Sequence, residues 1–280
     1  MRTLAAALSV AAAALALAAA APAAGPWLGV LDGGEGIAAS SGMVDYVATV
    51  AGGKTTVTAS RSVDGGTLAT ASVPGRFGIP FVTIAGDLGG LSRDGRTLVL
   101  AQPYTGSGEL RTTSEFAVFG TRPLALRTTV ELHGDFGFDA LSPDGRTLYL
   151  IEHASQRQLL SYRVRAYDLR AGKLLPGAIA DERQRGWLMN GMPVSRTTTA
   201  NGRWVYTLYS SGDNYPFVHA LDTTTRTAVC VGLPWQWTTA GTEIGTAKLT
   251  LSGGRLLVAG NGGAGTKFAL DTRTFRVTRL

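Results

Sequence analysis

The sequence predicts an all-β protein, a β-propeller of five blades with about four antiparallel strands each. A turn of the form Leu-Ser-Pro-Asp-Gly-Arg, complete at 141–146, recurs with variations along the chain, and its glycine stands at Gly95, Gly145, Gly202 and Gly254. Successive glycines are 50, 57 and 52 residues apart. A period of about 50 residues with several short strands per unit is typical of a propeller. Six blades, one of them assembled from the N-terminal segment, are the alternative.

The complete turn explains why strands end and begin where we predict them. Pro143 has the backbone angle of the second position of a type I turn, and Gly145 can take the positive φ that closes a bulged hairpin. One strand therefore ends at Ser142 and the next begins at Arg146. Residues 147–151 place apolar side chains on both faces of that next strand, so we expect sheets stacked on either side of it.

A second pattern follows the turn in three of the units, at 164–169, 218–223 and 267–272, and each copy ends in a further turn. The earlier chain follows the same plan more loosely, with predicted strands at 55–61 and 115–119. A strand at 44–50 precedes the first of these, so the first unit begins near Gly36. This gives five units.

The sequence of the unit around 141–150, followed by Val-Arg-Ala-Tyr-Asp-Leu at 164–169, resembles the repeats of bacterial YVTN or YncE-like propellers and of TolB/WD40-like propellers. The resemblance covers most of 38–280 and implies a propeller fold. Such propellers include lactonases, dehydrogenases and structural partners of envelope complexes, so it implies no single activity. The chain departs from the family pattern, because five units are fewer than the usual six or seven and only one keeps Ser-Pro-Asp-Gly.

The N-terminus predicts export. Residues 4–18 consist almost wholly of Ala, Leu and Val behind Arg2, and Ala-rich sequence suited to cleavage after Ala20 or Ala23 follows. We therefore assign 1–24 to a secretory signal peptide and 25–280 to the propeller domain, which would be secreted or periplasmic, within the cell envelope. After cleavage no transmembrane segment is expected, and a retained membrane anchor is the alternative. Cys230 is the single cysteine, so no internal disulfide can form, and we expect it to be a buried small side chain.

The charge pattern argues against nucleic acid as a partner. The formal net charge is +6, and 22 Arg and 4 Lys are scattered along the sequence with no dense cluster, which suits a basic surface meeting anionic polymers better than a nucleic-acid groove. We also predict no cofactor. The glycines of 260–265 match a dinucleotide-binding pattern, but the residues after them are strand-like, whereas that pattern must open a helix.

The long connections at the end of the sheets opposite the repeated turn hold most of the aromatic loop residues, so we place a ligand-binding site there. The predicted ligand-binding residues are Phe136, Phe138, Asp139, Trp187, Asn190, Tyr215, Trp235 and Trp237. The predicted function is a non-catalytic, monomeric scaffold that binds a protein, a small molecule or a glycan. For the tryptophans, packing between the sheets is the alternative role.

An enzyme is the rival prediction, a lactonase-like or metal-assisted hydrolase at the same end of the sheets. Its acid, base or metal-binding groups would come from one unit: His133, Asp135, Asp139, Glu152 and His153. Their spacing matches no closed set of metal ligands, so we predict no metal site and no catalytic residue. A structural partner of an envelope assembly is a third possibility.

Overall fold

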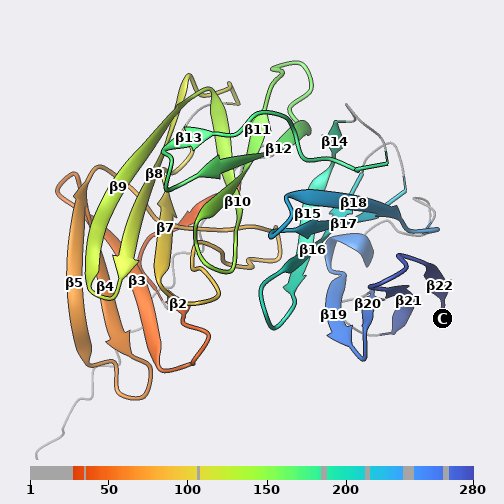
Figure 1. Ribbon diagram of the computed structural model, residues 1–280, viewed down its shortest axis with the longest axis horizontal. Coiled ribbons are helices and arrows are strands. Elements are labelled where there is room, and N and C mark those ends of the chain that lie inside the picture. Colours follow the sequence, from red (N-terminus) through yellow and green to blue (C-terminus); the bar gives the residue numbers. More distant parts are fainter. Residues whose placement is uncertain are drawn as a thin grey trace, which may run out of the picture.

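The computed structural model describes residues 28–34, 36–105, 108–183, 188–211, 215–235, 243–260 and 265–280. Their regular structure is almost all strand, arranged in antiparallel sheets that succeed one another in chain order (Figure 1). The all-β prediction is therefore confirmed. No helix in these described ranges has the length and apolar character needed to cross a membrane.

Five larger sheets are formed by the described residues. The first sheet contains β2 (Ile37–Ala38), β3 (Val44–Ala51), β4 (Lys54–Arg61) and β5 (Thr67–Pro74). The second contains β7 (Thr97–Ala101), β8 (Thr113–Thr121) and β9 (Leu124–His133). The third contains β10 (Asp135–Leu141), β11 (Thr147–His153), β12 (Ser161–Asp168) and β13 (Lys173–Leu174), with β14 (Met189–Asn190) also paired to β12.

The fourth sheet contains β15 (Met192–Thr198), β16 (Trp204–Ser210), β17 (Phe217–Asp222) and β18 (Thr227–Gly232). The fifth contains β19 (Lys248–Ser252), β20 (Arg255–Ala259), β21 (Thr266–Asp271) and β22 (Val277–Arg279). The N-terminal β1 (Val30–Leu31) pairs only with β6 (Ile79–Pro80), in a separate two-stranded sheet. Successive antiparallel strands joined by tight turns are the arrangement of propeller blades.

The turn between β10 and β11 forms as its sequence predicts. The hydroxyl of Ser142 accepts hydrogen bonds from the backbone N–H groups of Arg146 and Thr147, at 3.1 and 2.9 Å, and Gly145 has a φ of 65°. The structure adds a second reason for the glycine: a Cβ atom at this position would lie 2.4 Å from Oγ1 of Thr97, in the second sheet. Neighbouring turns thus press against each other as well as closing their own hairpins.

Apolar side chains fill the spaces between successive sheets, so each inner sheet is buried on both faces. In β11, Leu148 and Leu150 pack toward the second sheet and Tyr149 packs toward the fourth, all three fully buried. The prediction of a strand with two apolar, covered faces is confirmed. Four such cores, one between each pair of successive sheets, account for the buried apolar side chains of the described residues.

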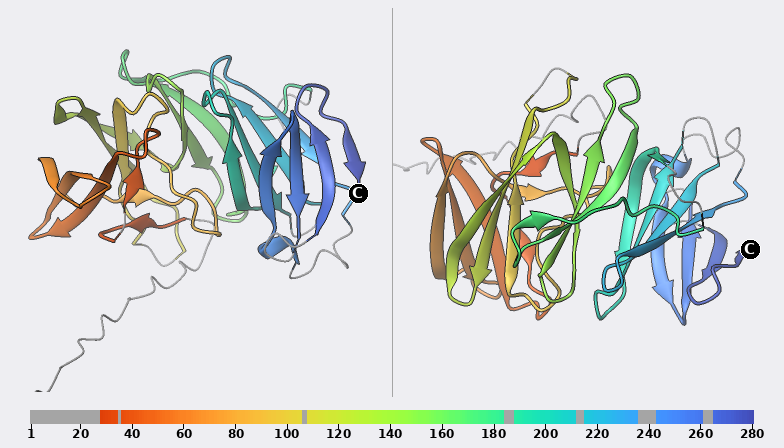
Figure 2. Two further views of the ribbon diagram at one scale, coloured as in Figure 1. Left: turned by 90° about the horizontal axis from the view of Figure 1, so that it is seen from below. Right: turned by 45° about the horizontal axis from the view of Figure 1, so that its top comes forward.

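The sheets form an arc whose ends stay apart. The first and fifth sheets lie at opposite ends of the longest axis of the molecule (Figures 1 and 2). Their outer faces are polar: Thr56, Thr58 and Ser60 of β4 alternate with buried residues, and in β19 Lys248 and Thr250 flank the buried Leu249. Polar outer faces leave little to gain from further stacking. The described residues therefore provide five sheets, while the number of blades in a complete ring stays a prediction.

Candidate functional site

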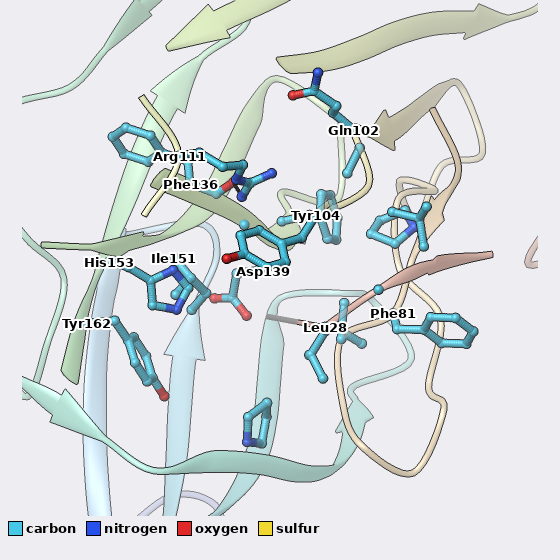
Figure 3. Close-up of a pocket in the computed structure, with 18 of the residues that line it drawn as sticks. Leu28, Phe81, Gln102, Tyr104, Arg111, Phe136, Asp139, Ile151, His153 and Tyr162 are labelled. Atoms are coloured by element: carbon cyan, nitrogen blue, oxygen red, sulfur yellow. Dashed lines mark hydrogen bonds between the residues drawn. The ribbon is translucent and has the colours of Figure 1, made fainter. Parts of the chain in front are cut away.

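A cleft opens where the inner strands of the middle sheets face one another, at the end of the sheets opposite the β10–β11 turn. We call it the axial cleft; it encloses about 700 Å³ including its open mouth. Its walls are largely apolar, and Figure 3 shows Leu28 and Phe81 on one side and Ile151, His153 and Tyr162 on the other. The remaining aromatic and polar side chains in its wall are Gln102, Tyr104, Arg111, Phe136, Phe138, Asp139, Arg196 and Tyr209.

A second hollow, whose empty space is about 730 Å³ with the open solvent at its mouth included, lies at the turn end of the same inner strands. It shares four residues with the axial cleft: Val82, Phe138, Asp139 and Arg196. These four side chains, which we call the partition, therefore lie between the two hollows.

The segment 81–88 crosses the axis and holds the partition in place. It leaves β6 and reaches the fourth sheet, where the backbone N–H of Ile84 donates to the carbonyl of Pro193 at 2.9 Å. Further along, the carboxylate of Asp87 accepts a hydrogen bond from the backbone N–H of Arg196, also at 2.9 Å. These bonds satisfy the inner edge of β15, which would otherwise be exposed.

A buried ion pair forms the polar part of the partition. Nη2 of Arg196 donates to the carboxylate of Asp139, and Nη1 donates to the backbone carbonyl of the same residue. The side chains are 10% and 3% exposed. Nε of Arg196 donates to the hydroxyl of Thr207 at 2.9 Å, so the guanidinium has partners on three sides. A charge this far from water requires such pairing.

A second ion pair lies beside the cleft mouth. Nε and Nη2 of Arg111 donate to Oδ1 of Asp135 at 3.0 and 2.8 Å, and Nδ1 of His153 lies 3.8 Å from the same oxygen. The guanidinium of Arg111 also stands over the ring of Tyr104, 5.9 Å from its centroid. Both arginines that reach the cleft are thus matched by an aspartate, which leaves the cleft walls apolar and electrically balanced.

The pKa of Asp135 makes the stability of this pair depend on pH. Burial alone would raise the pKa of the carboxyl group, but the nearby ring of His153 and the charge and hydrogen bonds of Arg111 outweigh burial, so the pKa is lowered from its ordinary value. A lowered pKa in the folded protein gives stability that is complete above the unfolded value and is lost as the pH falls through the folded value.

We therefore expect Asp135→Asn to lower the free energy of unfolding by about 2–3 kcal/mol at pH 7, because Arg111 loses its charged partner. At a second pH below the unfolded value of about 3.9, the difference between the variant and the original protein should shrink, since the stability that comes from the lowered pKa of Asp135 is lost as the pH falls. Urea unfolding at the two pH values measures both differences. A difference that stayed constant would show that the charge of Asp135 contributes nothing.

The structure places three of the predicted binding residues, Phe136, Phe138 and Asp139, in the wall of the axial cleft. Asn190 is half-buried in β14 and pairs with Ser161, next to the wall residue Gly191. Tyr215 is 57% exposed and lies by a separate hollow with Leu233 and Pro234.

Of the three predicted tryptophans, the structure describes Trp235, which does not line the cleft. Trp235 is 4% exposed, in the core between the fourth and fifth sheets, with its ring 5.8 Å from that of Phe268. This position matches packing between the sheets, which was the alternative role for Trp235. We therefore leave Trp235 out of the candidate site. Trp187 and Trp237 lie outside the described residues.

Several cleft residues were absent from the predicted set: Phe81, Val82, Arg111 and Arg196, together with the N-terminal Leu28. They come from segments far apart in the chain, and only the crossing of segment 81–88 brings them together. Arg196 had one signal in the sequence, since a lone charged residue within an inner strand requires a buried partner.

The proposed acid, base and metal-binding residues of the third unit are spread apart. Glu152 pairs with Arg165 at 2.8 Å, Asp139 pairs with Arg196, and His133 is exposed at the end of β9. Only Asp135 and His153 remain together. Among the residues that the structure describes, no three His, Cys, Asp or Glu side chains converge in the manner of metal ligands.

Burial shifts the pKa values of two tyrosines in the cleft wall and of a histidine and a cysteine behind it. Burial, reinforced by Tyr209, raises the pKa of Tyr162 well above its ordinary value, and burial raises that of Tyr209 in the same direction. Deeper in the same interface, Sγ of Cys230 lies 3.3 Å from Nδ1 of His219. Burial lowers the pKa of His219 to about 4, whereas burial followed by the charge of Asp181 raises that of Cys230 to about 12. The prediction of a buried, unreactive side chain at Cys230 agrees with this environment.

Stacked antiparallel sheets around an axial cleft place the chain in the β-propeller class. No protein-family model and no curated protein matches its sequence. In structure it is similar to the β-propeller domain of Cps50 (Swd1) from Myceliophteria thermophila, with 13% identity and a TM-score of 0.48 over 88% of this chain and 66% of that one.

It is also similar to Kuenenia stuttgartiensis hydrazine synthase, with 14% identity and a TM-score of 0.45 over 92% of this chain and 80% of that one. For TolB from Acinetobacter baumannii the identity is 13% and the TM-score 0.42, over 86% of this chain and 52% of that one. The chain thus spans less than two thirds of the Swd1 domain and about half of TolB. These likenesses concern the fold alone.

Proposed function

We propose that this chain is an exported, non-catalytic scaffold of the YVTN, YncE or TolB propeller type that binds a ligand in its axial cleft. Export rests on the N-terminal sequence, and the binding role rests on one observation. The cleft has largely apolar walls with six Phe or Tyr residues, and both arginines that reach it are already paired with aspartates. Small-molecule sites are typically concave and mostly apolar, with few polar groups.

The same observation defines the chemistry of the ligand. An anion would have to displace Asp135 or Asp139 from its arginine, and a cation would meet no free carboxylate in the described wall. A compact, uncharged and largely apolar molecule fits best, stacked against Phe81 and Phe136. The side-chain amide of Gln102 is available to hydrogen-bond a polar group of that molecule at the mouth.

Filling the cleft tests the proposal. A Cβ atom at Gly137 would contact only the Cβ of Ile151, at 3.9 Å, so Gly137→Leu adds a side chain to the cleft wall without backbone strain. We expect it to weaken binding of uncharged aromatic fragments by about tenfold or more, because the leucine occupies their space. In the original protein, a fragment at 100 times its Kd should raise the free energy of unfolding by about 2.7 kcal/mol.

Gly232→Leu is the matched control, since Gly232 also has free space at its Cβ but lies at the end of β18, away from the cleft. Fragments are screened by thermal shift and confirmed by NMR titration. The proposal fails if no uncharged fragment binds, or if the Gly137 and Gly232 variants bind the same fragments equally well.

A hydrolase is the second candidate function, and one observation favours it. The ring of His153 lies in the cleft wall with Nδ1 facing the carboxylate of Asp135, and a carboxylate that orients an imidazole is the arrangement of a general base. This candidate requires turnover of an ester or lactone by the purified protein, and loss of that turnover in a folded His153→Gln variant. Turnover that survives this substitution would exclude it.

A further inference from the structure

Arginines that are scattered in the sequence gather on one end of the molecule. One follows the turn glycine in each of the last four sheets: Arg96, Arg146, Arg203 and Arg255. The turns between the third and fourth strands of the third, fourth and fifth sheets add Arg170, Arg226 and Arg273, and the turn between β8 and β9 of the second sheet adds Arg122. All eight are exposed. Because both kinds of hairpin close at the same end of a sheet, these residues share one surface, which we call the turn face.

The turn face carries the excess positive charge of the chain. Its turns contain twelve Arg or Lys and six Asp, whereas the rest of the sequence contains fourteen basic and fourteen acidic residues, so the formal net charge of +6 belongs to this face. The turns counted are 40–43, 61–66, 92–96, 121–123, 142–146, 168–173, 199–203, 222–226, 252–255 and 271–276.

Several aspartates of the turn face are engaged by their own backbone. Asp168 accepts hydrogen bonds from the N–H groups of Arg170 and Ala171 at 2.9 and 2.8 Å, and Asp271 accepts one from Thr274 at 2.7 Å. Asp222 is buried; it accepts one from Thr224 at 2.9 Å and also pairs with Arg203, whose Nη2 lies 2.6 Å from Oδ2. These carboxylates are thus engaged within the protein, and the exposed arginines of the turn face outnumber them. The potential outside this face is therefore positive.

The arginines are concentrated at a depression between the turns of the second and third sheets. Arg96, Arg127, Arg146 and Arg170 all line it, against two carboxylates, Asp94 and Asp144. Oδ1 of Asp94 accepts from the hydroxyl of Ser92 at 2.7 Å. Asp144 likewise accepts from Ser142 at 2.7 Å and faces Nε of Arg146 at 3.5 Å. Four guanidinium groups thus line the depression against two carboxylates, so its formal net charge is positive.

We propose that the turn face binds a polyanion other than nucleic acid, with one oxyanion group of the polymer in this depression. A guanidinium can hold a phosphate or carboxylate through two parallel hydrogen bonds, which explains the use of Arg in place of Lys. The repetition of Arg on successive sheets suits a ligand with repeated charges. Bases would need exposed aromatic rings for stacking, but Trp204 and Phe275 of the described turn face are half-buried and packed together, 5.7 Å apart.

The test compares two triple variants with the same change of charge. Arg96→Gln, Arg146→Gln and Arg170→Gln together remove three of the four arginines of the depression, while Arg76→Gln, Arg157→Gln and Arg163→Gln remove three exposed arginines elsewhere. The probes are linear inorganic polyphosphate, poly-L-glutamate and single-stranded DNA with equal numbers of charges. Binding is followed by fluorescence anisotropy at salt concentrations of about 50 and 200 mM, and urea unfolding verifies that both variants fold.

We expect polyphosphate or polyglutamate to bind the original protein, more weakly at the higher salt concentration. The turn-face variant should bind about 10- to 100-fold more weakly and the control variant within roughly threefold of the original. The stronger of the two probes identifies phosphate or carboxylate as the recognised group. The proposal is overturned if neither probe binds at low salt, if both variants lose affinity equally, or if DNA binds as tightly as the other polymers.

Discussion

Replacing Asp139 with alanine is expected to lower the free energy of unfolding by about 3–5 kcal/mol. The carboxylate is 3% exposed and is the charged partner of Arg196, which is itself 10% exposed in the partition between the two axial hollows. The substitution leaves a guanidinium in a nearly dry place with only neutral acceptors, the carbonyl of residue 139 and the hydroxyl of Thr207. An uncompensated buried charge is more unfavourable than the loss of the pair as a whole.

Two further variants separate this explanation from a general effect of mutation. Asp139→Ala combined with Arg196→Met removes both charges and should be more stable than Asp139→Ala alone. Asp64→Ala breaks the exposed pair with Arg61, whose side chains are about half exposed, and should have a much smaller effect. Chemical denaturation of the four proteins gives the comparison. Equal losses for Asp64→Ala and Asp139→Ala would show that the partition holds no special ion pair.

Replacing Gly145 with alanine is expected to lower the free energy of unfolding by about 2–4 kcal/mol. About 1 kcal/mol of this comes from the positive φ of 65°, which an L side chain rarely adopts. The rest comes from overlap, since the new Cβ would lie 2.4 Å from Oγ1 and 2.6 Å from Cβ of Thr97. The turns of the second and third sheets would have to separate, and the core beneath them would loosen.

Gly254→Ala provides the matched control for this prediction. Gly254 likewise precedes the arginine of the corresponding turn in the fifth sheet, a two-residue turn between Ser252 and Arg255, and has a φ of 75°, but nothing lies within 4 Å of its Cβ position. Its replacement should therefore show the backbone penalty alone, about 1 kcal/mol. The same urea titration serves both variants. If Gly145→Ala is no less stable than Gly254→Ala, the contact between neighbouring turns does not contribute to the stability of the arc.

The cleft residues show how much of the site could be predicted. Phe136, Phe138 and Asp139 follow directly on a connection in the unit that best matches the repeat, and the structure places all three in the cleft wall. Trp235 has the same aromatic character in a similar connection, yet it packs against Phe268. The sequence pattern identifies an aromatic residue in a loop. Whether its side chain lines the cleft or packs in a core between sheets depends on which neighbouring sheet it contacts.

The stacking of the sheets could also be predicted from the sequence only in part. The repeat predicts that sheets stack, because its strands are apolar on both faces, and each inner sheet does so. Whether the stack closes depends on the angle between sheets and on the outer faces of the first and last ones. Those faces carry Thr56 and Thr58 at one end and Lys248 and Thr250 at the other. The alternation of polar and apolar residues along these strands is visible in the sequence. Whether the sheets then close into a ring depends on the angles between them, which the sequence pattern does not give.

The sequence by itself determined the strands, the hairpin turns and their period, because backbone preferences of Pro, Asp and Gly act over a few residues. It also determined that acidic and basic residues would sit in turns. Only the tertiary structure decided that segment 81–88 crosses the axis, with Asp87 bonded to Arg196 across 109 positions of the chain, and that the arginines share one face. Contacts between residues so distant depend on how whole sheets pack, and no local pattern specifies them.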